Sequence, residues 1–180
     1  MAEGNLIRIP PFNYIHVLNY NNNITSVVEG PITYVKQEHE HVLLGPEPML
    51  QIPPRHFCII SNPIIRNPSS KEVELDDYGM VRVRFGEREV RTNETHPEPF
   101  PLYPYEKKEK NISKIPIIDK NHAYKLLAVR DFVDLDGHKR NAGDEWLHIG
   151  PCSYIPQVEC DVVERISPLV IQPNRALKMQ

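Results

Sequence analysis

One acidic loop has the residue types of a cation site. Residues 131–137 read Asp-Phe-Val-Asp-Leu-Asp-Gly. An EF-hand calcium loop needs oxygen ligands at positions 1, 3 and 5, glycine at 6 and glutamate at 12. With Gly137 at position 6, Asp134 and Asp136 fall at positions 3 and 5, but phenylalanine and glycine occupy positions 1 and 12. The favoured interpretation is a hairpin turn at Asp136-Gly137. Weak calcium binding through Asp134 and Asp136 is the alternative.

The other residues that could do chemistry do not complete a known site. His39-Glu40-His41 places two imidazoles on one face of a strand, but a zinc site takes three or four protein ligands. We interpret this segment as solvated charge. No serine lies in a GxSxG turn, and the sequence has no GxGxxG or GxxxxGKS/T loop to hold phosphate. The sequence therefore predicts a non-enzymatic protein with no catalytic residue and no resident cofactor, and a small enzyme whose site is assembled from distant residues is the least favoured alternative.

Short segments of the sequence recur in the same register. The pairs are 8–15 with 51–58, 30–35 with 150–155, and 121–126 with 174–179, with a weaker copy of the second motif at 98–101. Self-similarity of this kind indicates tandem modules, each of which packs mainly on its neighbours. Modules of roughly 55 residues are only marginally stable alone. We therefore expect a chain that is built to assemble.

Proline content and short apolar runs predict an all-β fold. Eighteen prolines are spread through the chain and exclude long helices from most of it. Runs with strand character, often bounded by turn residues, are expected to form strands at 14–18, 56–60, 80–86, 146–149 and 162–166. Asn19 to Asn23 reads as a hairpin turn. The expected fold is a series of small antiparallel β-sheets, about 55 residues each, in an elongated array.

Composition narrows the classes of partner. The net charge is −3 and the basic residues are scattered, which disfavours nucleic-acid binding as the main role. No apolar run approaches the roughly 18 residues of a membrane span, so we expect no membrane partner. The N-terminus lacks the features of a secretory signal, and the three cysteines form no CxxC pair. We expect a cytoplasmic protein with reduced thiols.

Several of these segments, in this order, resemble the N-terminal repeats of the major vault protein family. The matching stretches are 7–11, 14–18, 53–58, 100–104 and 142–156. The resemblance covers essentially the whole chain. It implies vault-type repeats at residues 1–54, 55–117 and 118–170, with a truncated fourth repeat beginning at 171–180. It also implies that the sequence is an N-terminal piece of a longer chain, whose assembly-driving helical region lies further on.

What the resemblance implies for function is structural. In that family many copies of one chain stand side by side in the shell of a hollow ribonucleoprotein particle, and the N-terminal repeats lie at the waist where two half-shells meet. The implied partners are further copies of the chain, a vault poly(ADP-ribose) polymerase and a telomerase-associated protein. A small vault RNA belongs to the particle but is not expected to bind this segment. The family is also described as having calcium-binding loops in this region. The implied location is the cytoplasm, with a minor nuclear fraction.

Five residues are candidates for contacts between chains. Ile7, Arg8 and Ile9 lie in the segment expected to touch another half-shell. Tyr34 and Tyr154 follow the two Gly-Pro turns at equivalent positions. They either pack each small sheet against its neighbour or contact a separate chain. The alternative function is a monomeric modular β-repeat protein that recruits a protein partner and binds calcium weakly.

Overall fold

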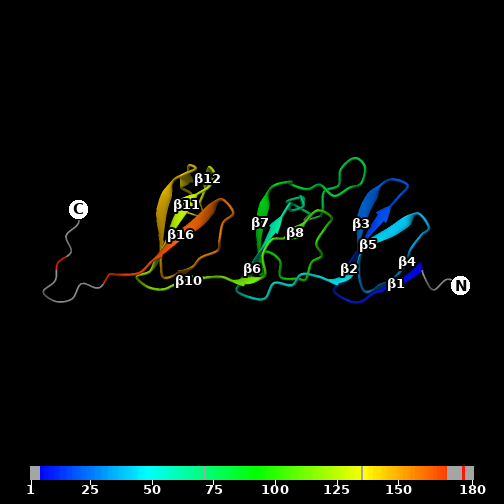
Figure 1. Ribbon diagram of the computed structural model, residues 1–180, viewed down its shortest axis with the longest axis horizontal. Helices are drawn as coiled ribbons and strands as arrows, with labels where there is room; N and C mark the ends of the chain where they lie inside the picture. Colours follow the sequence, from blue (N-terminus) through cyan, green and yellow to red (C-terminus); the bar gives the residue numbers. More distant parts are fainter. Residues whose placement is uncertain (1–4, 71, 135, 170–175, 177–180) are drawn as a thin grey trace. The chain divides into compact units, whose positions relative to one another are not determined.

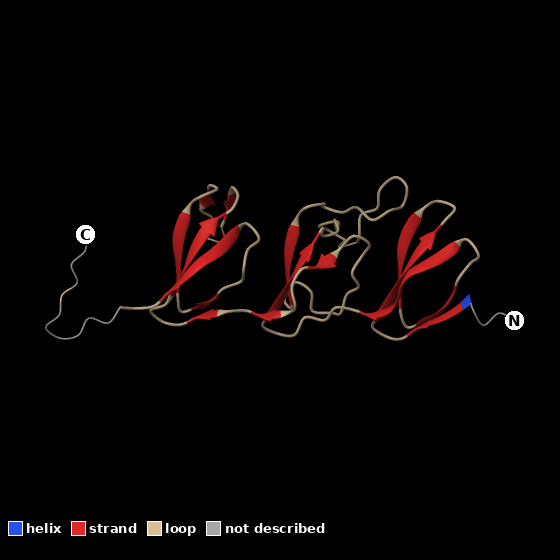
Figure 2. Ribbon diagram, viewed as in Figure 1, coloured by secondary structure: helices blue, strands red, loops and turns tan. Residues whose placement is uncertain are grey.

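The computed structural model describes residues 5–70, 72–134, 136–169 and 176 (Figure 1). These residues form sixteen β-strands and no α-helix; the short blue piece before β1 (Leu6–Ile9) in Figure 2 is one residue in 3-10 conformation, Asn5. The predicted all-β class is confirmed. Within the described ranges no helix has the length and apolarity needed to cross a bilayer. The chain divides into two compact units, Met1–Lys114 and Ile115–Gln180.

The first repeat consists of strands β1 to β5. Their bounds are β1 Leu6–Ile9, β2 Asn13–Asn19, β3 Ile24–Glu29, β4 Ile32–Val35 and β5 Glu40–Pro48. The strands form an antiparallel sheet of order β3-β2-β5 and a separate β1-β4 pair. Ile9, Ile15 and Val17 form the buried core between them. The expected hairpin turn at Asn19 to Asn23 joins β2 to β3, and Asn23 has a φ of 58°.

The second repeat lies in the same unit and has shorter strands. They are β6 His56–Ser61, β7 Arg88–Thr92, β8 Lys107–Lys108 and β9 Ser113–Lys114, and the other three all pair with β6. An isolated bridge between Leu50 and Phe100 takes the place of the β1-β4 pair. The core consists of Ile52, Cys58, Ile60 and Phe100.

The third repeat makes up the second unit. Its strands are β10 Ile117–Ile118, β11 Ala123–Ala128, β12 Phe132–Val133, β13 Lys139–Arg140, β14 Glu145–Ile149, β15 Cys152–Ser153 and β16 Cys160–Ile166. The sheet has the order β14-β11-β16, and two-stranded β10-β15 and β12-β13 pairs lie beside it. Ile118, Leu126 and Tyr154 form its core. Where each repeat ends at the residue level stays a prediction, and the expected fourth repeat falls outside the described residues apart from Ala176.

One predicted strand is wrong. Residues 80–86 alternate apolar and basic side chains, but they form only isolated bridges, from Val81 to Leu75 and from Val83 to Ile64. A ladder needs one continuous partner strand, and here alternate residues pair with two different segments. The stretch from residue 62 to 87 folds back on itself as a long excursion between β6 and β7.

The recurring Pro-Pro segments form equivalent turns. Asn13 N donates to Pro10 O at 3.2 Å, and His56 N donates to Pro53 O at 3.1 Å. The third turn residue has a positive φ in both, 58° at Phe12 and 61° at Arg55, as a type II turn requires. The same arrangement precedes β11, where Asn121 has a φ of 67°.

The two Gly-Pro motifs are also structurally equivalent. A Cβ on Gly30 would collide with the carbonyl oxygens of Ile9 and Pro10, and one on Gly150 would collide with those of Ile118 and Asp119. The first and third repeats therefore use glycine because another segment of backbone passes directly against it. This match sets the correspondence between repeats that the next section uses.

Candidate functional site

One core position can be matched in all three repeats. Tyr34 lies opposite Ile7 in the β1-β4 pair. Tyr154 N donates to Pro116 O at 2.9 Å, and Phe100 N donates to Leu50 O at 3.1 Å. Each ring packs into the apolar core of its own repeat.

In the first and third repeats this ring carries a hydroxyl that is already bonded. Tyr34 Oη donates to Glu40 Oε2 at 2.7 Å. Tyr154 Oη lies 3.5 Å from Cys160 Sγ, a residue at the same spacing of six. Burial, reinforced by Glu40, raises the pKa of Tyr34 to about 12, and burial also raises the pKa of Tyr154. Both tyrosines thus lie in the core of their own repeat, and a role in contacts between chains stays a prediction.

The second repeat places a buried ion pair at the same position. Phe100 has no hydroxyl, and Glu106, six residues later, is paired with Nη2 of Arg91. Arg91 Nε donates to Glu89 Oε1 at 2.9 Å, and its guanidinium carbon lies 5.1 Å from the centre of the Phe100 ring. Burial opposes the charge on Arg91, but the carboxylates of Glu106 and Glu89 raise its pKa above the ordinary value. Arg91 is 1% exposed and Glu106 is 6% exposed.

Glu106 has a second role as an anchor for the backbone. Its Oε1 accepts the N–H of Ile64 at 3.1 Å, and its Oε2 accepts that of Tyr103 at 3.0 Å. Charged acceptors make strong hydrogen bonds in buried surroundings. The carboxylate therefore holds the excursion after β6 and the turn before β8 together. Sequence reasoning missed this cluster, although the spacing from Phe100 to Glu106 repeats that from Tyr34 to Glu40.

The N-terminal interface candidates differ in their exposure. Ile9 is buried in the core of the first repeat, and Ile7 packs against that core. Arg8 is exposed and lies opposite Thr33 in the β1-β4 pair. Of these three residues, Arg8 is the one whose side chain is available to another chain.

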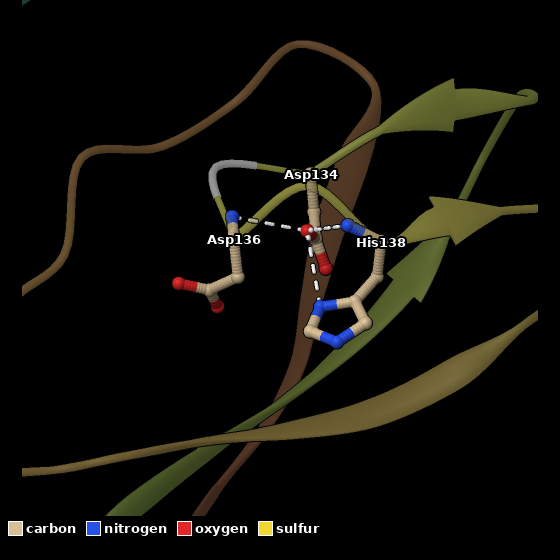
Figure 3. A group of neighbouring side chains, drawn as sticks. All are labelled: Asp134, Asp136 and His138. Atoms are coloured by element: carbon tan, nitrogen blue, oxygen red, sulfur yellow. Dashed lines mark hydrogen bonds and ion pairs between the residues drawn. The ribbon is translucent and has the colours of Figure 1, made fainter.

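The acidic loop is a hairpin turn between β12 and β13 (Figure 3). Oδ1 of Asp134 accepts the backbone N–H groups of Asp136 at 3.0 Å and of His138 at 2.8 Å. Its Oδ2 accepts Nε of Arg140 at 2.9 Å. Gly137 has a φ of 83°, as the predicted Asp-Gly turn requires.

These bonds decide what Asp134 can do chemically. Burial would raise its pKa, but the bond from the His138 backbone and the charge of Arg140 lower it overall. Ligand atoms of Asp134, Asp136 and His138 lie within 4.8 Å of one another. Calcium, however, takes six to eight oxygens, and both oxygens of Asp134 already accept protein donors. The geometry favours the turn, and calcium binding stays a hypothesis.

The first two repeats contact each other within their unit. His16 Nε2 lies 2.7 Å from Leu102 O, and Thr25 N lies 3.2 Å from Sδ of Met80. Thr25 belongs to the edge strand β3, so the excursion of the second repeat covers part of that edge. A cavity of about 670 Å³ at this junction is lined from both repeats, among others by Leu44 and Lys107.

Comparison with known proteins shows to which family these repeats belong. Profiles described as Major Vault Protein repeat domain match residues 49–112 and 116–157. The chain belongs to the major vault protein repeat family. It is 46% identical over 178 residues to the Major vault protein of Strongylocentrotus purpuratus, 47% over 179 residues to that of Mus musculus and 45% over 179 residues to that of Homo sapiens. Each alignment covers 99% of this chain and 20% of the relative.

Family membership confirms the resemblance drawn from the Pro-Pro and Gly-Pro segments. The chain spans about a fifth of the length of these vault relatives. The matched ranges include the buried Arg91–Glu106 pair and the acidic loop at Asp134. Both features therefore lie inside vault repeats rather than in segments added to them.

Proposed function

We propose that this chain is part of a structural, non-enzymatic subunit of a large hollow ribonucleoprotein particle of the vault type. Many copies associate side by side, and the particle resides in the cytoplasm with a minor nuclear fraction. The observation that carries this proposal is the identity of 44% to 47% to vault relatives from sea urchin, mouse and Dictyostelium, which extends over at least 99% of the chain.

The surface of the repeats supports lateral association. Each three-stranded sheet in the first and third repeats has an edge strand on either side, and the second repeat covers only part of the β3 edge of the first sheet. Large apolar side chains are exposed along these sheets and pairs, including Val35 and Leu43 in the first repeat and Leu147, Ile149 and Val163 in the third. Strand edges and apolar surface that one chain leaves exposed are stabilised when an identical chain covers them. A constant rotation between copies then closes a ring.

Within the particle we place this segment at the waist, with Arg8 at the contact between half-shells. Arg8 is exposed on β1, whereas Ile7 and Ile9 pack inward. The vault poly(ADP-ribose) polymerase and the telomerase-associated protein are the proposed protein partners. The vault RNA is proposed to belong to the particle without binding these repeats.

The assembly proposal is tested with a chimera. These 180 residues replace the matching N-terminal part of the mouse relative, and the product is sized by light scattering and viewed by electron microscopy. Hollow particles of megadalton mass are expected. Soluble monomers would favour the alternative, a modular β-repeat protein that recruits a partner through its loops.

The waist is tested in the same chimera with Arg8→Glu. Charge reversal at a contact between half-shells is expected to convert whole particles to halves without unfolding β1, because Arg8 is exposed. Lys120→Glu is the matched control, since Lys120 is exposed in the turn before β11. Whole particles from the Arg8 variant, or halves from both variants, would contradict the assignment.

A further inference from the structure

One thiol of the third repeat lies beside an imidazole. Sγ of Cys152, in β15, lies 3.3 Å from Nε2 of His148, in β14. The other polar neighbour of this thiol is the carbonyl oxygen of Ile149, at 3.7 Å. The imidazole nitrogen is the nearer acceptor, and in the tautomer that carries its proton on Nδ1 it can take up the thiol proton. The pair therefore has the two parts of an activated thiol, a nucleophile and a base within reach of it.

The repeat fold does not require a polar pair at these positions. His148 precedes the glycine of its Gly-Pro motif by two residues and Cys152 follows it by two, as Val28 and Ile32 do in the first repeat. The strand after the motif pairs antiparallel with the first strand of the repeat in both cases. Two aliphatic side chains thus fill these positions in the first repeat, so packing alone does not account for a thiol beside an imidazole.

The three cysteines of the chain, all of which lie in the described residues, differ in accessibility. Cys58 is 1% exposed and Cys160 is 5% exposed, and burial raises the pKa of both thiols. Cys152 is partly exposed. A thiol reacts as the thiolate and only where a reaction partner can reach it. Of the three thiols, Cys152 is therefore the one placed to react in the folded chain.

We propose that Cys152 is a site of reversible exchange with low-molecular-weight disulfides, with His148 as its base. Sγ of Cys152 attacks one sulfur of the disulfide while the thiol proton passes to Nε2 of His148. The disulfide bond breaks as the new S–S bond forms, and the departing thiolate takes the proton back from the imidazolium. Cys152 is oxidised to a mixed disulfide and the departing sulfur is reduced to a thiol. This chemistry does not depend on the role of the chain in a shell.

Oxidised glutathione tests the proposal on the folded 180-residue chain. After incubation in excess reagent at neutral pH and an acid quench, intact mass and peptide mapping measure the rate of adduct formation at each cysteine. A single adduct on Cys152 is expected, and dithiothreitol should remove it. In urea all three cysteines should react, because burial no longer protects the other two. A folded chain that forms no adduct, or one that reacts as fast at Cys58 or Cys160, would overturn the proposal.

A second measurement separates the base from a structural role. His148→Gln should slow the reaction of Cys152 at neutral pH by at least about tenfold, as the loss of a general base does. His122→Gln is the matched control in the same repeat, since Nδ1 of His122 lies 3.4 Å from the carbonyl oxygen of Lys120 instead, and the rate should stay unchanged.

The effect of His148→Gln should also disappear in alkaline solution. At about pH 10, above the ordinary thiol pKa of about 8.5, the thiolate forms without a base. The variant and the wild type should then react at similar rates. Equal rates at neutral pH, equal slowing by His122→Gln, or a difference that persists at alkaline pH would show that His148 is not the base.

Discussion

The first and second repeats pack an aromatic ring at the same core position but surround it with different polar groups. In the first, the neutral hydroxyl of Tyr34 donates to Glu40, which lies in a half-buried position. In the second, Phe100 has lost that hydroxyl, and the guanidinium of Arg91 lies over the ring and binds Glu106. A hydrogen bond from a neutral hydroxyl to a carboxylate at the edge of the core is thus exchanged for an ion pair inside it.

Both repeats keep a hydrogen bond in which a backbone N–H of the turn donates to the carboxylate three residues later. Glu40 Oε2 accepts the N–H of Gln37 at 2.9 Å, and Glu106 Oε2 accepts that of Tyr103 at 3.0 Å. In the third repeat the thiol of Cys160 takes this place and is bonded by the backbone of Gln157. The comparison teaches that the backbone geometry of the turn fixes the acceptor at residues 40, 106 and 160. The side chain that donates to this acceptor differs between repeats: it is Tyr34 in the first and Arg91 in the second.

The largest expected effect follows from breaking the buried pair. Arg91→Met leaves the carboxylate of Glu106 buried without its cation and should lower the free energy of unfolding by about 3–5 kcal/mol. Urea denaturation followed by circular dichroism measures the change. The double variant Arg91→Met/Glu106→Gln should recover part of the loss, because glutamine is neutral, although its single carbonyl oxygen can replace only one of the two oxygens that accept the N–H groups of Ile64 and Tyr103.

Arg130→Met provides the control for charge removal as such. Arg130 pairs with Glu159 at 2.6 Å, but its side chain is 52% exposed. Exposed pairs contribute about 0–1 kcal/mol. If Arg91→Met cost no more than Arg130→Met, the second repeat would not depend on its buried charge, and the contrast with the first repeat would disappear.

A second comparison concerns the glycines of the first and third repeats. Gly30→Ala and Gly150→Ala each force a methyl group against two carbonyl oxygens, and overpacking of this kind costs about 1–3 kcal/mol or more. Gly45→Ala in β5 is the control, because no atom lies within 4 Å of its Cβ position. Thermal unfolding should separate the two classes. Equal melting temperatures for Gly30→Ala and Gly45→Ala would show that the backbone can move aside.

The strands were predictable where local pattern and turn chemistry agree. Short apolar runs that follow Pro-Pro pairs predicted β2 and β6, and an Asp-Gly dipeptide predicted the hairpin after β12. The alternation at residues 80–86 wrongly predicted a strand. Alternation indicates which face of a segment is apolar, but it does not show whether one continuous partner strand is present. Arg91 and Glu106 are 15 residues apart and belong to different segments, so no local pattern indicates their contact. A buried arginine is also contrary to the usual preference for exposure.

A smaller effect separates the two tyrosines. Tyr34→Phe should cost about 0.5–1.5 kcal/mol, the usual net contribution of one hydrogen bond. Tyr154→Phe should cost less, because the thiol of Cys160 is a weak acceptor. The bond from the Gln37 backbone, followed by that from Tyr34, lowers the pKa of Glu40. The contribution of Glu40 is therefore full above the ordinary glutamate pKa and is lost as the pH falls through the lowered value.

This pH dependence can be measured by comparing unfolding in urea at neutral and acidic pH. The difference between wild type and Tyr34→Phe should shrink on acidification, because protonated Glu40 no longer favours the donor. The difference for Tyr154→Phe should stay constant over the same range, since Cys160 does not titrate there and burial raises its pKa further. Parallel behaviour of the two variants would contradict the distinction between carboxylate and thiol acceptors.

The smallest expected effect concerns the hairpins of the first and third repeats. The first turn uses asparagine side chains, with Asn19 Oδ1 accepting the N–H of Asn21 at 2.9 Å, and the third uses Asp134 in the same way.

If Asp134 is a turn residue, calcium should give no heat in calorimetry and no rise in melting temperature. Asp134→Asn should lower the melting temperature more than Asp136→Asn, because Arg140 loses its charged partner while Asp136 is exposed. Saturable calcium heat abolished by Asp136→Asn would instead make this loop a cation site and set the third repeat apart from the first in function as well as in sequence.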